Sequence, residues 1–298
     1  MRKAIQGRIV PFQIPKSDRE FIRYQEDCGV HFYDRLHQHP EIQLTLIRAG
    51  YGQFMSRDYI GRFEPGDIFL LGENVPHVFR SDPEFFEVGS KLNSHSLTIF
   101  FDLATMHQAV KEVEDLRSLS TLNQFSGKAF QILGERKVVL ADGIRGFHRK
   151  KGLSRLGAGL EFLDLILSGK PELISLGKDE LPTRFSEKDG QRMNRIIQFI
   201  LANQSNKISL EEVAGEANLS KEAFCRFFKE RTRMTFTEYL NQLRIMEAKK
   251  LLENSNSDIT QLAFQVGFEN MSYFHRVFRR QTGKTPLQYR KQLLQTSA

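Results

Sequence analysis

Residues 258–290, DITQLAFQVGFENMSYFHRVFRRQTGKTPLQYR, contain the most informative pattern in this chain. Apolar residues recur at helical spacing on both sides of Gly267, which predicts two short helices joined by a tight turn. Glycine suits that turn because it adopts a positive φ without a Cβ clash, and Asn270 is a favourable N-cap for the second helix. The second helix is expected to expose a polar stripe formed by Ser272, His275, Arg276 and Arg279. A helix with a packed back and a basic front can lie in a DNA major groove.

The same pattern occurs about 50 residues earlier, in SLEEVAGEANLSKEAFCRFFKERTRMTFTEY, residues 209–239. Six residues of this first copy recur 50 positions later: Phe224, Arg226, Phe228, Thr232, Thr235 and Tyr239 recur as Phe274, Arg276, Phe278, Thr282, Thr285 and Tyr289. At the turn, Asn218 takes the place of Gly267, and asparagine is the next most tolerant residue of left-handed backbone. The polar stripe of the first copy is Glu222, Cys225, Arg226 and Lys229. This internal duplication predicts two helix-turn-helix units.

The segment GFENMSYFHRVFRRQTGKTPLQYR, residues 267–290, resembles the signature of the AraC/XylS family of bacterial transcriptional regulators. The resemblance covers about residues 189–292. It implies two helix-turn-helix units bridged by a long helix, with each unit reading one face of the major groove. Glu222 and Cys225 depart from the common pattern, which leaves the base preference of the first unit open.

The polar stripes allow separate roles for individual side chains. We expect base edges to be contacted by Glu222, Cys225, Arg226, Met271, Ser272, His275 and Arg276. We expect phosphates to be contacted by Lys221, Lys229, Arg279 and Arg280. The aromatic residues of the two copies lie at core spacing and are not expected to stack on bases: Phe224, Phe228, Phe274, Phe278, Tyr239 and Tyr289.

Cap signals place the other helices of this region. Capping-box patterns occur at two helix starts, Ser209 with Glu212 and Thr235 with Glu238. The second pattern begins a long connecting helix over about residues 236–253, which would set the spacing of the two reading helices. One turn of B-DNA is about 34 Å, and the two units must be about that far apart to read one face. Pro286 suits the first position of the last helix.

Charge divides the chain into two parts. Residues 188–298 hold 18 Lys and Arg against 11 Asp and Glu, so the whole excess of +7 lies there, and residues 1–187 are neutral. Ordinary solvated helix faces would also carry positive charge. Together with the duplicated motif, however, the excess indicates a polyanion-binding module attached to a neutral one.

Residues 1–102 are predicted to be rich in short strands. The expected strands are residues 41–47, 53–55, 58–63, 68–71, 77–79 and 96–101, separated by Pro, Gly, Asn and Asp turn signals. Many short strands at this spacing favour a sandwich or barrel. The stretch LHQHPE at residues 36–41, followed by GDIFLL at residues 66–71 and by Pro76-His77, resembles the two cupin motifs found in sensor domains of the same regulator family.

The histidines of that region have two interpretations. In enzymatic cupins, residues of the types found at His37, His39, His77 and Glu41 or Gln43 hold a transition metal through neutral imidazoles. The spacing to Glu41 is shorter here than in the enzymatic motif. We therefore expect no metal and no cofactor. The expected effector-binding residues, which would hydrogen-bond a polyhydroxylated or acidic ligand, are His37, His39, Glu41, Gln43 and His77.

The sequence predicts four segments. They are a cupin-like effector-sensing β-barrel at residues 1–102, a helical extension at 103–170, a linker at 171–187 and an all-α DNA-binding domain at 188–298. Helices are expected at residues 135–149 and 153–167, the second with one apolar stripe of leucines beginning at Leu153. That stripe either packs within the domain or forms a dimer contact, and the family resemblance favours the dimer contact.

The function predicted is that of a ligand-responsive transcription regulator. Its expected partners are double-stranded promoter DNA, a small-molecule effector such as a sugar or related metabolite, a second copy of the chain and RNA polymerase. Two alternatives remain: a metal-dependent cupin enzyme with an accessory helical domain, and a DNA-repair or architectural protein. No nucleophile–base pairing or phosphate loop supports catalysis, so we expect no enzyme activity. Two cysteines and the lack of a long apolar run favour the cytoplasm and no membrane contact.

Overall fold

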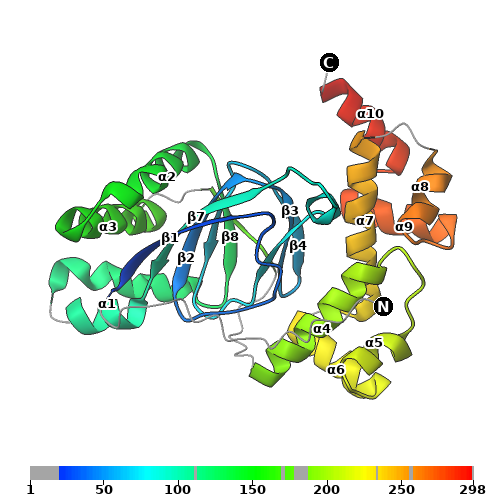
Figure 1. Cartoon of the computed structure of the whole chain (residues 1–298), viewed down its shortest axis with the longest axis horizontal. Coiled ribbons are helices and arrows are strands. Elements are labelled where there is room, and N and C mark those ends of the chain that lie inside the picture. The colour runs from blue at the N-terminus through cyan, green and yellow to red at the C-terminus, as the bar shows by residue number, and fades with distance from the viewer. Residues whose placement is uncertain are drawn as a thin grey trace. The chain divides into compact units, whose positions relative to one another are not determined.

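The computed structural model describes residues 20–110, 113–168, 172–177, 187–232, 234–254 and 258–296. The chain divides into two compact units between Gly190 and Gln191 (Figure 1). The N-terminal unit is built mainly from strands and the C-terminal unit from helices, which confirms the predicted fold class. Among the described residues, none of the helices combines the length and apolar character needed to cross a membrane.

The N-terminal unit contains two antiparallel sheets. Its strands are β1 (Ile22–Gly29), β2 (Ile42–Ala49), β3 (Gly52–Ser56), β4 (Tyr59–Phe63), β5 (Ile68–Leu71), β6 (Val78–Ser81), β7 (Ser94–Phe101), β8 (Ala129–Leu133) and β9 (Glu172–Ser175). The larger sheet has the order β1-β7-β2-β5-β8-β9, and the smaller has the order β4-β3-β6. The helical elements are η1 (Pro83–Phe86), α1 (Leu103–Val110), η2 (Glu114–Phe125), α2 (Glu135–Gly146), η3 (Phe147–Arg149) and α3 (Gly152–Ser168).

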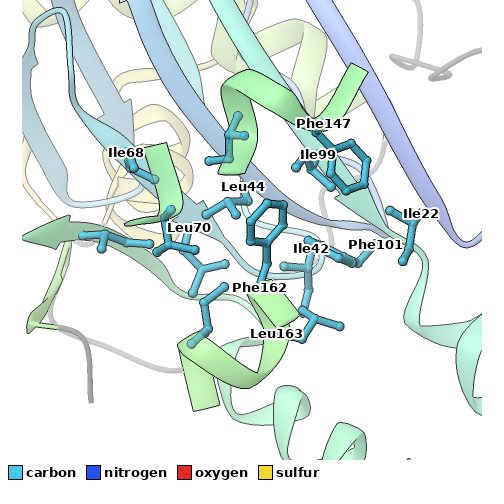
Figure 2. Packing of buried hydrophobic residues seen from close by; sticks show 14 of the residues in the cluster. Ile22, Ile42, Leu44, Ile68, Leu70, Ile99, Phe101, Phe147, Phe162 and Leu163 are labelled. Carbon is cyan, nitrogen blue, oxygen red and sulfur yellow. The ribbon is translucent and has the colours of Figure 1, made fainter. Parts of the chain in front are cut away.

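The larger sheet is buried on both faces in its central strands, and alternate residues pack in opposite directions. In β2, Ile42 and Leu44 join a cluster that includes Phe101 of β7, and helical residues such as Phe147 and Phe162 complete it (Figure 2). Side chains alternate across a strand, so their immediate neighbours in β2 and β7 point to the opposite face. This one cluster attaches the helical layer α2 and α3 to the sheet.

The opposite face of the larger sheet packs against the smaller sheet through aromatic rings. Phe54 on β3 lies with its ring centroid 4.8 Å from that of Phe79 on β6 and 4.9 Å from that of Phe69 on β5. Phe32 meets Phe63 edge-to-face at 5.0 Å. Such aromatic pairs contribute beyond their buried area. This second cluster joins the two sheets.

Six predicted strands are confirmed as β2 to β7, but three strands were missed. β1 pairs with β7, while β8 and β9 lie within residues expected to be helical or linker. The expected linker at residues 171–187 was wrong for Glu172–Ser175, because β9 pairs with β8 as the edge strand of the sheet. Of the remaining linker residues, 171 and 178–186 lie outside the described part of the chain.

The predicted helix pair of the sensor region is confirmed as α2 and α3, with η3 following α2. The face assigned to the second helix was wrong at its start. Leu153 is 84 % exposed, whereas Phe162 and Ile166 are buried against the sheet. The rest of the predicted stripe is confirmed, because Leu163 is buried and Leu156, Leu160 and Leu167 pack against the same cluster. Whether α3 also forms a dimer contact stays a prediction.

The C-terminal unit is entirely helical. Its helices are α4 (Glu187–Asn203), α5 (Leu210–Glu216), α6 (Lys221–Thr232), α7 (Phe236–Asn254), α8 (Ile259–Gln265), α9 (Met271–Thr282) and α10 (Pro286–Thr296). Ser209 and Glu212 form the expected capping box at the start of α5. Asn270 caps α9 by accepting a hydrogen bond from the Tyr273 backbone N–H. The predicted helix starts are therefore confirmed at both positions.

The internal duplication is reproduced down to single hydrogen bonds. The hydroxyl of Thr232 donates 2.8 Å to the Phe228 carbonyl, and that of Thr282 donates 2.8 Å to the Phe278 carbonyl. In the same way, the backbone N–H of Thr235 donates to the Glu238 carboxylate, and that of Thr285 donates to the Gln288 amide oxygen. Both distances are 2.9 Å. These equivalent hydrogen bonds, 50 positions apart, show that the two copies have the same local structure.

Candidate nucleic-acid interface and effector cavity

Each helix-turn-helix unit exposes the polar stripe expected from the sequence. The exposed residues are Glu222, Cys225, Arg226 and Lys229 on α6, and Ser272, His275, Arg276 and Arg279 on α9. Lys221 and Arg280 are exposed as well. Met271 is only half-exposed, because its side chain packs against the core of the second unit. The structure therefore presents both stripes to solvent and places Met271 at the edge of one.

The backs of the two reading helices are buried by aromatic residues. Phe224, Phe228, Phe274 and Phe278 are fully buried, as is Tyr239, whereas Tyr289 is half-buried against the second core. Phe228 meets Tyr239 edge-to-face at 5.2 Å, and Phe278 meets Tyr289 edge-to-face at 5.7 Å. These rings hold the helices in place and are not available to stack on bases, as the sequence predicted.

The turn of the second unit needs glycine for two reasons. Gly267 has a φ of +96°, and a Cβ placed there would lie 2.8 Å from the Gln204 carbonyl oxygen and 2.9 Å from that of Ser205. In the first unit, Asn218 takes the equivalent turn with a φ of 52°. The predicted left-handed backbone is confirmed at both turns, and at Gly267 another loop also approaches the backbone closely.

Arg244, which sequence reasoning missed, holds that approaching loop. From the middle of α7 its guanidinium donates to the Gln204 carbonyl at 2.7 Å and to the Asn206 carbonyl at 2.7 Å. It also lies over the Phe268 ring, 5.8 Å from the centroid. Arg244 therefore fastens the loop after α4 against the turn of the second unit. An arginine on a long amphipathic helix carries no sequence signal for this role.

Asn241 makes a second link between α7 and a reading helix. Its side-chain amide donates to the Tyr273 hydroxyl at 2.6 Å, and Asn241 itself is buried. Tyr273 in turn lies beneath Arg276, whose guanidinium carbon is 5.2 Å from the ring centroid. These contacts orient α9 on α7 and restrain the side chain expected to read a base. The sequence contained no signal for this link.

Acidic groups near the expected phosphate-contacting residues set the local electrostatics. Lys221 is paired with Glu211 of α5. Hydrogen bonds from Thr235 hold the pKa of Glu238 below its usual range, and Arg280 and Lys229 lower it further. Glu238 is thus ionised at neutral pH and lies in the field of two cations expected to meet DNA. It moderates the positive charge there without removing it.

The N-terminal unit contains a cavity of about 360 Å³. Strands β1, β2 and β7 supply most of its wall, and the rest comes from the segment between β1 and β2, from His77 and from Phe79 on β6. Its polar lining is formed by Gln25, Asp27, Cys28, His31, Tyr33, His37, Gln43, Thr45, His77, Ser94, Ser96 and Thr98. Its apolar lining includes Phe32, Ile47, Phe79 and Phe100. Aromatic and hydroxyl-bearing walls of this kind are typical of small-molecule sites.

A buried hydrogen-bonded chain runs along one wall of the cavity. His39 Nε2 lies 2.8 Å from Gln43 Oε1, and the Gln43 amide donates to Thr45 Oγ1 at 2.7 Å. Thr45 Oγ1 lies 3.0 Å from Thr98 Oγ1 on the neighbouring strand. On its other side, His39 Nδ1 is 3.3 Å from a carboxylate oxygen of Glu41, and both side chains are buried. Gln43 and the two threonines are thereby held in fixed rotamers facing the cavity.

His37 and His77 form a matched pair at the cavity. Their backbones make an isolated antiparallel bridge, with N–H···O distances of 3.0 Å and 2.8 Å, and their ring centroids are 4.3 Å apart. Burial lowers the pKa of His37 to about 4, against a smaller opposing effect of the Arg35 carbonyl. Burial also lowers the pKa of His77 well below its usual range, and neighbouring histidines add to this. Both imidazoles are therefore neutral near pH 7.

The structure brings the five expected effector-binding residues together but gives them different positions. His37, Gln43 and His77 line the cavity, while His39 and Glu41 lie behind that wall and support Gln43. The cavity residues that sequence reasoning missed lie mainly on β1 and β7, namely Gln25, Asp27, Ser94, Ser96 and Thr98. The alternation of polar and apolar residues in SHSLTIFF, residues 94–101, was the signal that could have identified the last three.

Comparison with known protein families matches both units. A model of the AraC-like ligand binding domain matches residues 22–140, and a model of a helix-turn-helix domain matches residues 213–292. The HTH-type transcriptional activator RhaR of Escherichia coli (strain K12) is 24% identical over 258 residues, covering 85% of this chain and 86% of the relative. RhaR of Shigella boydii serotype 4 (strain Sb227) is 23% identical with the same coverage.

Two solved structures also show similarity to this chain. ToxT from Vibrio cholerae O395 is 16% identical, with a TM-score of 0.35, and the match covers 92% of this chain and 100% of ToxT. The C-terminal domain of the response regulator yesN from Fusobacterium nucleatum subsp. nucleatum is 31% identical, with a TM-score of 0.31. That match covers 32% of this chain and 93% of the domain.

A ligand-binding domain followed by a helix-turn-helix domain defines a one-chain transcription regulator, which senses a molecule with one part and binds DNA with the other. The two family matches and the relatives show which kind it is. The chain is an AraC-type transcription regulator. The resemblance inferred from residues 267–290 is thereby confirmed.

Proposed function

We propose that this regulator binds a small, neutral, hydroxyl-rich molecule in the cavity of its N-terminal unit. The composition of the cavity wall carries this proposal. Among the described residues that line it, none is Lys or Arg, and Asp27 is the one carboxylate. His37 and His77 are neutral near pH 7 because of their lowered pKa values. A wall without a cation disfavours the acidic ligand that the sequence had left open, whereas hydroxyl groups can exchange hydrogen bonds with the serines, threonines and amides.

The polar residues of the cavity take two roles in this proposal. His37, Gln43 and His77 contact the ligand, and the rings of Phe79 and Phe100 pack against its apolar face. His39 and Glu41 act through Gln43, whose rotamer they hold. We assign no catalytic role to these residues, since the relatives are transcriptional activators.

On DNA, we propose that the exposed stripes of α6 and α9 enter successive major grooves. Base edges are contacted by Glu222, Cys225, Arg226, Met271, Ser272, His275 and Arg276. Phosphates are contacted by Lys221, Lys229, Arg279 and Arg280. The exposure of the ten residues other than Met271 supports this assignment. The link from Asn241 to Tyr273 supports it further, because it fixes the orientation of α9 on α7 before DNA is bound.

The regulatory step couples the two units through linkage. A ligand shifts an equilibrium only if it binds one arrangement better than another. We propose that the effector selects one arrangement of the DNA-binding units in a homodimer, or frees them from the N-terminal unit, and so changes access of RNA polymerase to a promoter. Free, exposed Cys28 and Cys225 fit a reducing cytoplasm as the place of action.

The ligand proposal is tested by thermal unfolding of the full-length protein against a panel of neutral sugars and polyols, each paired with its carboxylate analogue. We expect a neutral compound to raise the Tm, and Gln43→Leu to reduce that shift by most of its value. Gln124→Leu, the same change at an exposed residue of η2, should leave the shift unchanged. Stabilisation by the carboxylates alone would contradict the proposal.

The DNA proposal is tested separately by selecting bound duplexes from genomic fragments, with and without the compound that stabilises the protein. We expect two half-sites one helical turn apart, about 34 Å, and a changed preference for half-site spacing when the compound is present. An identical spacing preference and affinity in both conditions would remove the regulatory step while leaving the DNA-binding assignment intact.

A further inference from the structure

Three side chains of different metal-binding types meet at the edge strand β1. Glu26 and Cys28 lie on β1 and His95 on the neighbouring strand β7, and one ligand atom of each lies within 4.8 Å of those of the other two. We propose that this edge cluster binds one Zn²⁺ ion. Thiolate, imidazole and carboxylate are the groups that hold zinc in proteins, and a water would complete its usual four-coordinate shell. A soft thiolate also favours zinc over Mg²⁺ or Ca²⁺.

The pairing of β1 with β7 brings the three residues together. Cys28 lies directly opposite His95 in this antiparallel ladder, and Glu26 lies two residues before Cys28 and therefore on the same face. Side chains that face each other across a ladder have Cβ atoms about 4.5–5.5 Å apart. Ligands placed on strands are held more precisely than ligands on loops. The expectation that no metal binds was drawn from the cupin-like motif at residues 36–77, and none of these three residues lies within it.

The edge cluster lies where β1 emerges from the helical layer. Near the start of the strand, Ile22 is buried in the core that attaches this layer, and Tyr24 packs against the same core. Further along the same face, Glu26 and Cys28 are exposed. The side chains of Glu26 and His95 are 46% and 27% exposed. An ion can therefore reach the edge cluster without any opening of the fold.

Existing contacts already orient two of the ligands. His95 Nε2 lies 2.8 Å from Glu26 Oε1, and the Tyr24 hydroxyl donates to Glu26 Oε2 at 3.3 Å. Metal-ligating carboxylates commonly have such an outer hydrogen bond. Cys28 is a free, exposed thiol, which becomes a ligand on losing its proton to solvent. Ligand atoms around a tetrahedral zinc ion are roughly 3.3 Å apart, so the imidazole and the carboxylate need to separate only slightly to admit it.

An ion at the edge cluster would act on the wall of the cavity. Gln25 and Asp27 alternate with the cluster residues along β1 and line the cavity, and Cys28 also borders it. In the part of the sheet that the structure describes, β1 is the edge strand and is paired with β7. A bound ion would add a side-chain link between these two strands and so fix the wall that they form. Binding of the ion requires neither the effector nor DNA, so this proposal and the proposed function fail separately.

The test uses full-length protein with Cys225→Ser, which leaves Cys28 as the one cysteine of the chain. The protein is reduced, stripped of metal with a chelator and titrated with Co²⁺, which occupies zinc sites and gives a charge-transfer absorption in the near ultraviolet when a thiolate binds it. We expect this absorption to saturate at one equivalent of cobalt per chain and to disappear when Zn²⁺ displaces the cobalt. A titration without this absorption overturns the proposal.

Variants in the same background assign the ligands. Cys28→Ser should abolish the charge-transfer absorption, and His95→Gln should weaken cobalt binding by more than about 100-fold, the upper end of the range for outer-shell changes. Glu26→Gln should also weaken binding. Asp27→Asn is its matched control, because Asp27 is an exposed carboxylate one residue along the strand and on the opposite face. Equal losses for the two carboxylate variants would indicate a general effect of charge and contradict the assignment.

X-ray absorption at the zinc edge decides the matter if a cluster variant fails to fold. It uses the Cys225→Ser protein loaded with one equivalent of Zn²⁺, in which the edge cluster is intact. We expect one sulfur scatterer at about 2.3 Å, together with nitrogen and oxygen at about 2.0–2.2 Å. A first shell without sulfur would place the ion at another group of side chains and overturn the proposal.

Discussion

The two helix-turn-helix units share their scaffold but differ in their reading surfaces. In both units, one threonine hydroxyl donates to a carbonyl in the last turn of the reading helix, and a second threonine lies at the start of the next helix, where its backbone N–H is bonded. Between those points, the first unit exposes Glu222 and Cys225 where the second exposes Ser272 and His275. The threonines that close hydrogen bonds within the protein recur, whereas among the exposed residues Arg226 recurs as Arg276 but its neighbours on the stripe differ. Framework and recognition are therefore separable properties of this domain.

Substitution of the turn glycine tests the framework, and we expect it to have the largest effect on the free energy of unfolding. Gly267→Ala places a Cβ against two carbonyl oxygens at a positive φ, so we expect a loss of roughly 2–4 kcal/mol of unfolding free energy. Gly215→Ala is the matched control: it lies in α5 of the first unit, with no heavy atom within 4 Å of the added Cβ. It should stabilise by about 0.5–1 kcal/mol. Urea unfolding followed by far-UV circular dichroism measures both, and equal stabilities would show that the turn is not constrained.

The reading surfaces are compared by removing the equivalent arginines. We expect Arg276→Ala and Arg226→Ala each to relax specificity at a base pair in a different half-site, by about 1–3 kcal/mol of discrimination. Competition binding with single-base variants of the selected site measures this. Arg276→Lys keeps the charge but loses bidentate geometry, and should behave more like the alanine variant than like the wild type. Loss at the same position for both arginines would mean that the units do not read separate half-sites.

The smallest effect is expected from the phosphate contacts. Arg279→Ala and Lys229→Ala should each weaken binding evenly across sequences and reduce the slope of log K against log salt by about 0.9. Lys229 lies in the field of Glu238, so its removal should change affinity less than removal of Arg279 does. Titrations between low and physiological salt test both variants. A change in base preference for either would move that residue to the base-contacting group.

Much of the C-terminal unit could be predicted from sequence because its determinants are local. Caps, turn residues and apolar stripes lie within a few residues of the helices they specify. Each of these signals also occurs in both copies of the 50-residue repeat. The contacts of Arg244 and Asn241 could not be predicted, since their partners are more than 30 residues away. No local pattern distinguishes such residues from solvent-exposed members of a long helix.

The N-terminal unit was less predictable because its contacts join distant segments. β1, IRYQEDCG, has the polar composition of a loop, and only its pairing with β7 makes it a strand. β8 is a five-residue strand whose partner, β5, lies about 60 residues earlier. The meeting of His37 with His77 across 40 positions likewise depends on the folded sheet. The residue types of the candidate site were visible in the sequence, but their division into cavity wall and support was not.

The double-sided burial of β2 and β7 has a consequence for how such sensors diversify. Gln43 and Thr45 face the cavity while their neighbours Ile42 and Leu44 hold the helical layer. Substitutions at every second position can thus exchange one inducer for another and leave the packing on the reverse side unaltered. Related regulators could thus evolve to bind new effectors through the same two strands, while the core on their reverse side stays unchanged.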